Sequence, residues 1–219
     1  DEYWDARQYS RMKSAIEGGL NVLWLCGNSV FIDSPFTASS SGQPNRILTR
    51  RGCFGDLRQD ETENYGHLFD ALKSTAPDER KIMGVRSVVP FNGGGDWTCR
   101  KADHWIFEGT GMKNGDSIPG LVGWEHHGEP DPDLEGLEVL AEGKVWAGGV
   151  REGKYTSVIF PGPKENFVFN ASTVFWNMGL STPPGHWAPY SHYSRPHGPD
   201  ERVQRITKNL LNRAIHGGE

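Results

Sequence analysis

The hydrophobic pattern near the start of the chain predicts a helix followed by a buried strand. Apolar residues recur at helical spacing after Asp5, a favoured N-cap, until Gly18 and Gly19 end the pattern. A continuous apolar run, residues 21–29, follows directly and closes with glycine, asparagine and serine. A run that is apolar on both faces is typical of a strand covered by helices on either side, as in βαβ units. Because a parallel sheet of this kind needs a preceding strand, we expect a further strand upstream of Asp1.

The end of the chain predicts a second amphipathic helix. Asp200 is a favoured N-cap, apolar residues follow at helical spacing as far as Ala214, and Gly217 ends the pattern. Another helical pattern spans residues 65–72 and ends before Pro77.

The middle of the chain predicts strands. Residues 137–141, 155–160 and 166–170 are apolar runs bounded by glycine and proline at short intervals, which is typical of an antiparallel sheet. A shorter strand is expected at residues 85–89. Residues 182–199, rich in proline, histidine and aromatic side chains, predict a long loop held against the core.

The stretch 104–129 predicts a hairpin-like unit with chemistry at its end. An apolar strand opens at His104, the glycine-rich segment 109–116 turns the chain, and residues 121–122 return as a second strand. Directly afterwards stand Glu125, His126, His127 and Glu129, which are proton carriers and potential metal ligands. We take Glu125 and His126 as the catalytic candidates. Because Pro130-Asp-Pro follows, the alternative for His126, His127 and Glu129 is an exposed loop.

Composition limits the partners and the compartment. The formal net charge of −5 argues against a nucleic-acid partner, which leaves a basic footprint. No segment approaches the roughly 18 consecutive apolar residues of a membrane span. We therefore expect a soluble domain, in the cytoplasm or the periplasm. The three cysteines are an odd number at no metal-like spacing, which predicts buried thiols rather than disulfides or a zinc site.

Four motifs resemble the C-terminal domain of the N,N-dimethylformamidase large (beta) subunit and its relatives. They are Asp1-Glu-Tyr-Trp, the run at residues 18–29, the stretch from His104 to Glu125, and residues 202–212. The resemblance covers both ends and the middle of the chain, whereas residues 28–83 match poorly.

The resemblance implies a fold similar to that of class I glutamine amidotransferases. That fold is α/β and flavodoxin-like, with a partial parallel sheet and helices, and here it would carry a β-rich antiparallel portion. Residues 1–219 would be a single C-terminal domain, with residues 1–30 and 200–219 as its α/β framework and residues 83–180 as the β-rich portion. An upstream domain or a partner subunit would complete the sheet.

The implied activity is hydrolysis of a small formamide to formate and an amine, at a mononuclear iron held by two tyrosines and a glutamate. Hard, anionic oxygen ligands suit a Lewis acid that polarises the amide carbonyl. Only Tyr3 transfers as a ligand, because it alone lies in a matching motif. The second tyrosine would lie upstream, and the glutamate falls in the poorly matched region, where neither Glu61 nor Glu63 can be chosen. Glu125 matches a site-lining carboxylate of the family.

Structural alternatives remain open for these residues and for the whole chain. Tyr3 could be a buried aromatic that hydrogen-bonds a neighbour, and Glu125 could pair with an arginine. His104 is more often a core histidine than a ligand. The chain as a whole could be a non-catalytic relative, a structural or a carbohydrate- or partner-binding domain that uses the aromatic loop at residues 187–193. Iron content and formate release distinguish the two hypotheses.

Overall fold

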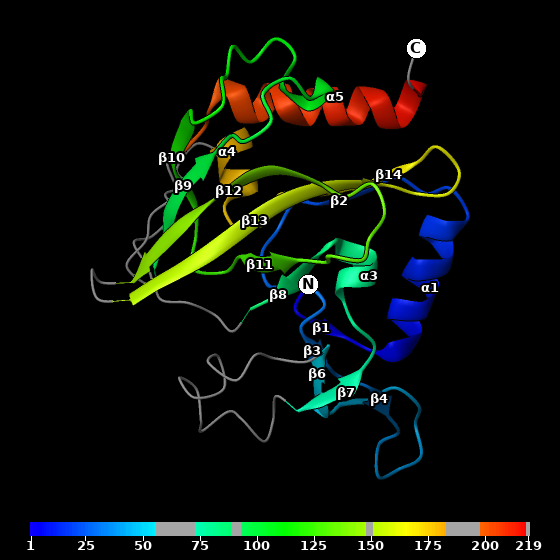
Figure 1. Ribbon diagram of the computed structural model, residues 1–219. Helices are drawn as coiled ribbons and strands as arrows, with labels where there is room; N and C mark the ends of the chain where they lie inside the picture. The colour runs from blue at the N-terminus through cyan, green and yellow to red at the C-terminus, as the bar shows by residue number, and fades with distance from the viewer. Residues whose placement is uncertain (56–72, 89–92, 148–150, 183–197, 218–219) are drawn as a thin grey trace.

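The computed structural model describes residues 1–55, 73–88, 93–147, 151–182 and 198–217 (Figure 1). Within them the fold is mixed α/β and strand-rich, with several small sheets and few helices. The flavodoxin-like fold is not confirmed. None of the described helices is long and apolar enough to cross a lipid bilayer.

The largest described sheet has the order β12-β13-β14-β2. It contains β12 (Glu138–Ala147), β13 (Arg151–Pro161), β14 (Phe167–Asn170) and β2 (Val22–Trp24). β12, β13 and β14 are antiparallel neighbours, which confirms the predicted antiparallel strands, and β2 joins β14 in parallel. The predicted strand at residues 21–29 is thus real but short.

A second four-stranded sheet has the order β1-β3-β6-β7. It contains β1 (Tyr3–Trp4), β3 (Ile32–Asp33), β6 (Gly52–Phe54) and β7 (Ser74–Ala76). β1 pairs with β3 in parallel. Since β1 and β2 belong to different sheets, β1 does not supply the further strand that the hydrophobic pattern requires, and the strand expected upstream of Asp1 stays a prediction.

Three two-stranded sheets complete the described strands. They are β4 (Phe36–Thr37) with β5 (Ile47–Leu48), β8 (Val85–Ser87) with β11 (His127–Pro130), and β9 (Gly95–Thr98) with β10 (Ser117–Val122).

Both predicted terminal helices are confirmed. Helix α1 (Ala6–Glu17) begins with Asp5, whose side chain accepts a hydrogen bond of 2.7 Å from the N–H of Gln8 in a capping box. Helix α5 (Glu201–His216) begins with Asp200, which caps the N–H of Arg202. The short helices are α3 (Arg80–Met83) and α4 (Trp176–Leu180). The predicted helix at residues 65–72 and most of the loop at residues 182–199 lie outside the described residues.

The strand predicted to open at His104 is wrong. Residues Trp105–Phe107 form a 3-10 helix, η2, with His104 as its N-cap. A run of three apolar residues has no periodicity that distinguishes strand from helix, and Gly109, with φ of +72°, reverses the chain immediately afterwards. The strand that pairs with β10 is instead β9.

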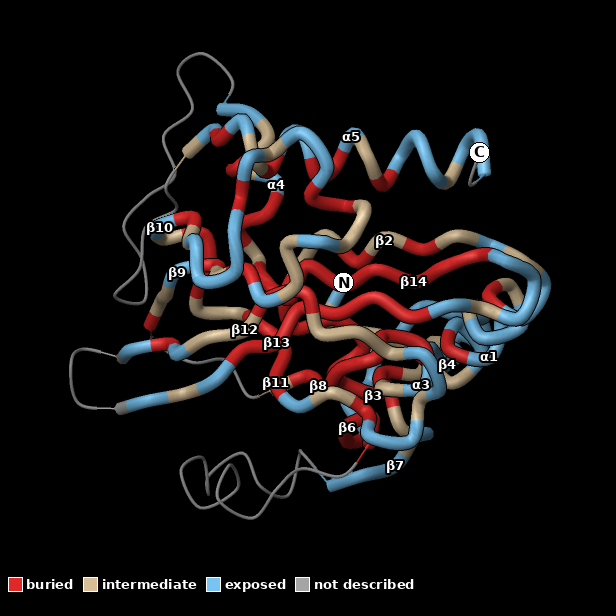
Figure 2. The backbone as a smooth tube through the Cα atoms, turned by 45° about the horizontal axis from the view of Figure 1, so that its top comes forward, coloured by how far each residue is buried: buried red, intermediate tan, exposed pale blue. Residues whose placement is uncertain are grey.

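The main sheet separates two hydrophobic clusters. Alternate residues of β14 face opposite sides: Phe169 packs in the cluster with α4 and α5, whereas Val168 packs in the cluster with α1 and α3. In Figure 1, α5 lies along one side of this sheet, and β8, β11 and the start of the chain lie on the other. Buried residues run through the centre of the molecule along β13 and β14 (Figure 2).

A buried polar network stands at the end of β14, where Asn170 is fully buried. Its Oδ1 lies 2.8 Å from Nδ1 of His127 and accepts the N–H of Ser172, and its Nδ2 donates to the carbonyl of Met83. The side chain therefore links β14 to β11 and α3. Asn170 stands in an Asn-Ala-Ser glycosylation pattern, but its burial makes that match fortuitous.

We expect Asn170→Ala to lower the free energy of unfolding by about 3 kcal/mol, because it leaves several buried polar groups without partners. Urea denaturation of the purified chain measures the change. The matched control is Asn114→Ala, which removes one exposed hydrogen bond to the N–H of Ala102 and should cost less than about 1 kcal/mol. Equal losses in the two variants would contradict the role of the network.

Candidate functional site

The candidate site lies where the loop after β2 crosses the start of the chain. The N–H of Val30 donates to the carbonyl of Asp1 at 3.1 Å, and the N–H groups of Phe31 and Ile32 donate to the carbonyl of Glu2. Residues 1–4 and 28–33 are thereby fixed as one unit. The loop leaves the carboxyl end of β2, an edge at which parallel strands commonly present ligand-binding groups.

The same loop lies against the segment that enters β11. A Cβ added to Gly27 would stand 2.1 Å from the carbonyl oxygen of Glu125, so a side chain at position 27 would collide with that backbone. The N–H of Ser29 donates to Nε2 of His127 at 3.0 Å. Glycine at position 27 thus lets the backbone at Glu125 approach the loop closely.

Two carboxyl groups, those of Glu2 and Glu125, lie near each other in this site. Burial raises the pKa of Glu125 to about 7, with the negative charge of Glu2 raising it as well. Burial also raises the pKa of Glu2, although Arg50 and the Tyr3 hydroxyl favour its charged form. The site therefore holds two partly desolvated acids that repel each other when both are ionised.

Tyr3 is connected to the same group of residues. Its hydroxyl accepts a hydrogen bond from the Arg50 guanidinium, which also lies over the Tyr3 ring at 5.2 Å from the centroid, and the hydroxyl favours the charged form of Glu2. Tyr3 and Glu125, both predicted as site residues, are thus each close to Glu2. Glu2 itself was not singled out, although it stands inside the first motif, between Asp1 and Tyr3.

The alternative prediction that His126 and His127 lie in an exposed loop is wrong. His126 and His127 are buried, and only Glu129 of the three is exposed. Backbone pairing explains the difference, because His127 begins β11 opposite Ser87, and His126 forms a bridge with Thr173.

His127 has a structural environment. Burial lowers its pKa to about 4, so the ring is neutral near pH 7. Nε2 accepts the N–H of Ser29, and Nδ1 must then carry the proton and donate to Asn170. The ring fixes the position of the loop and has no lone pair left for a metal.

Among the described residues, no group of three or more histidine, cysteine, aspartate and glutamate side chains could hold a metal ion. The three oxygen-bearing side chains of Glu2, Tyr3 and Glu125 form a different kind of set, because one of them is a phenol. Hard oxygen donors of this type suit hard, highly charged cations.

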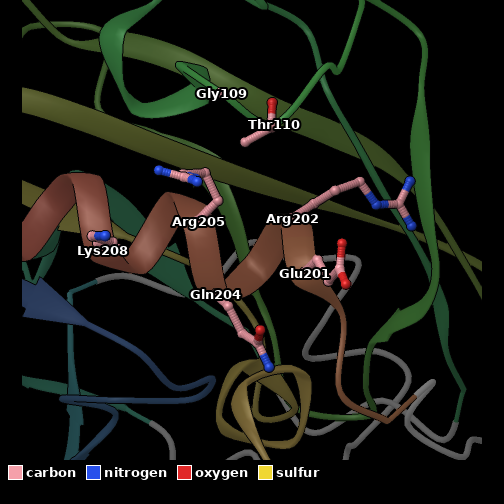
Figure 3. A pocket seen from close by; sticks show the side chains of 7 residues that line it. All are labelled: Gly109, Thr110, Glu201, Arg202, Gln204, Arg205 and Lys208. Carbon is pink, nitrogen blue, oxygen red and sulfur yellow. The ribbon is translucent and has the colours of Figure 1, made fainter.

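A cavity of about 400 Å³ beside α5 is a less convincing site (Figure 3). Its charged side chains diverge, because Arg202 extends away from Arg205 and Lys208, and the Gln204 amide donates to the carbonyl of Leu180. Arg202 is also engaged by Asp200 through two hydrogen bonds.

A second cavity, of about 340 Å³, adjoins Trp105. The ring of Trp105 is already packed against Arg213, Phe167 and His104. His104 caps η2 and its side chain is 8 % exposed, which agrees with its structural interpretation. In neither this cavity nor the one beside α5 do the polar side chains converge on a common position where they could bind one ligand.

We expect Glu2→Gln to lower the pKa of Glu125 from its value of about 7, because the substitution removes the nearby negative charge while keeping the side-chain shape. Carbon-13 NMR titration of the glutamate carboxyl groups measures the pKa. The matched control is Glu135→Gln, at an exposed position on another loop, which should leave the titration of Glu125 unchanged. An unchanged pKa in Glu2→Gln would show that the two acids do not interact.

Comparison with known families identifies one match. A family model described as N,N-dimethylformamidase beta subunit-like, C-terminal, matches residues 1–194. The search of curated proteins found no match. The matched segment includes Tyr3, Glu125 and His126, together with the loop after β2.

Proposed function

The chain belongs to the N,N-dimethylformamidase beta subunit-like family, and from this premise we propose that it is a hydrolase-type domain for metal-assisted hydrolysis of a small amide of the formamide class. The observation that carries the proposal is the grouping of Glu2, Tyr3 and Glu125 beside the loop after β2. The products would be a carboxylic acid and an amine.

The donor chemistry of this group fits a mononuclear iron ion. Tyr3 would be a ligand through its phenolate oxygen, and the two neighbouring carboxyl groups supply negative charge that a cation would neutralise. When bound, iron would act as a Lewis acid toward the amide carbonyl. Further ligands would come from outside the described residues, where Glu61 and Glu63 lie, or from an upstream domain or partner subunit. The beta-subunit-like description of the family supports such a partner.

Glu125 is proposed as the general base and acid. A pKa of about 7 lets the carboxyl group exchange protons readily near neutral pH. Its carboxylate would take a proton from the attacking water as the new C–O bond forms, and would return it to the nitrogen as the C–N bond breaks. Glu125 thus takes up one proton and releases one proton in each hydrolysis, and no second proton carrier is needed.

His126 is the second proposed catalytic residue. It directly follows Glu125, and its ring is buried and close enough to His127 that its charge contributes to the lowered pKa there. Replacement by glutamine preserves a polar side chain without the proton exchange of imidazole. A loss of turnover in His126→Gln with unchanged metal content would support a catalytic role, and normal turnover would remove it from the proposal.

We expect Tyr3→Phe to abolish iron retention and formate release. Elemental analysis of the chain with its upstream domain or partner subunit measures the metal, and the phenolate-to-iron absorption band in the visible provides a second measure. The matched control is Tyr9→Phe, which removes a hydroxyl that donates to the carbonyl of Asp78, away from the site, and should keep iron. Full iron occupancy in Tyr3→Phe would exclude Tyr3 as a ligand. Absence of iron and of hydrolysis in the unaltered protein would favour the non-catalytic alternative.

We expect kcat/KM to rise as the pH passes the pKa of Glu125, because water is activated by the ionised carboxylate; this pKa is about 7 without a metal, and a bound cation would lower it. Glu125→Gln should lose activity by about 100-fold or more and should lack this pH dependence. Removal of the Glu2 charge lowers the pKa of Glu125, so the rise should move to lower pH in Glu2→Gln if that variant keeps its metal. Initial rates of formate release between pH 5 and 9 provide the measurement, and an unshifted profile with intact metal would contradict the assignment.

A further inference from the structure

Asn28 is the most unusual polar residue of the site. Its side chain is 1 % exposed, and neither Oδ1 nor Nδ2 has a hydrogen-bond partner among the residues that the structure describes. Buried polar groups are almost always paired, and an unpaired one costs about 1–3 kcal/mol. A carboxamide with both ends unpaired is therefore expensive to keep in the interior.

The backbone two residues after Asn28 is strained. Asn28 has a φ of +50°, and Val30, a β-branched residue, has a φ of +52°. Valine adopts the left-handed region only when its surroundings impose it. Here the surroundings are held by hydrogen bonds. The N–H of Val30 donates to the carbonyl of Asp1, the N–H of Ser29 donates to the His127 ring, and the carbonyl of Ser29 accepts from the hydroxyl of Ser87.

The position of Asn28 connects it to the proposed reaction. It stands between Gly27, which lies against the backbone of Glu125, and Ser29, which is held by His127. It also belongs to the loop that crosses Glu2. Asn28 therefore places a buried donor, Nδ2, and a buried acceptor, Oδ1, next in sequence to Gly27, the residue whose backbone contacts that of Glu125.

We propose that Asn28 is a substrate-binding and specificity-determining residue that pairs with the amide group of the substrate. This inference rests on the proposed function of the same site. A planar primary amide carries a carbonyl oxygen and an N–H on the same edge. The substrate carbonyl oxygen would accept a hydrogen bond from Nδ2 of Asn28, and the substrate N–H would donate to Oδ1. One ligand would thus satisfy both polar atoms of the side chain.

The pairing sets a preference among substrates. Formamide has the required N–H, whereas N,N-dimethylformamide has none and would leave Oδ1 unpaired. A site built to hydrogen-bond an N–H rejects analogues that lack it, because its own buried group then remains unsatisfied. Asn28 therefore favours primary amides over fully N-substituted ones.

The test compares formamide with N,N-dimethylformamide in Asn28→Gly, a variant that deletes the carboxamide and relieves the strain of positive φ. We expect the ratio of kcat/KM for formamide to that for N,N-dimethylformamide to fall about tenfold, as for one lost hydrogen bond, with iron content unchanged. The matched control is Asn45→Gly, an exposed asparagine at φ of +55°, which should leave the ratio unchanged. An unchanged ratio in Asn28→Gly would overturn the proposal.

A second readout is independent of catalysis. In the full chain labelled with nitrogen-15 at asparagine and freed of paramagnetic metal, the side-chain NH₂ resonance of Asn28 is assigned by its disappearance in Asn28→Gly. Formamide should shift this resonance, and N,N-dimethylformamide should shift it less. Shifts without any hydrolysis would leave the binding role intact while the proposed function fails. Hydrolysis without a shift would mean that a fixed water molecule, rather than substrate, satisfies Asn28, and the inference would fail alone.

Discussion

The buried ring of His127 is the constraint on which the arrangement of the site depends. It accepts a hydrogen bond from Ser29 on the loop after β2 and donates to Asn170 at the end of β14, while its own backbone begins β11. The ring can serve both contacts only in its neutral form, which burial enforces by lowering its pKa to about 4. Three segments that are distant in sequence are thus fixed relative to one another by one side chain that takes no part in the proposed chemistry.

This fixed frame explains how the site can hold groups that are unfavourable by themselves. Glu2 and Glu125 are partly desolvated near each other, Asn28 is buried without partners, and Val30 has a strained backbone. Each would relax if the loop could move. The anchors around it are backbone hydrogen bonds and the buried side-chain hydrogen bonds of His127, Ser87 and Asn170, and they oppose that relaxation. A binding site whose polar groups are held in place before the ligand arrives requires such a rigid frame.

The sequence predicted the local features of the fold better than its pairings. Helices α1 and α5 were predictable because cap, apolar spacing and terminal glycine all agree at both ends. The strands β12 to β14 were predictable from their apolar runs. The pairing of β1 and β2 with their neighbours could not be predicted, because periodicity shows which face of a strand is buried but not which strand lies beside it. For that reason the pattern at residues 5–29 did not show that a strand, β1, precedes α1, or that β1 and β2 join different sheets.

The site was partly visible in the sequence for the same reason. Tyr3 and Glu125 could be selected by residue type and motif, and the structure brings both close to Glu2. His126 and His127 looked exposed because Pro130 follows them, but Pro130 occurs at the end of β11, where it pairs with Val85 and does not prevent burial of the strand. The importance of Asn28 could not be read from sequence at all, since lacking a partner is a property of the folded surroundings. An asparagine after a strand-ending glycine ordinarily indicates a turn. Only its burial, with both polar atoms unpaired among the described residues, supports its assignment as a ligand-binding residue.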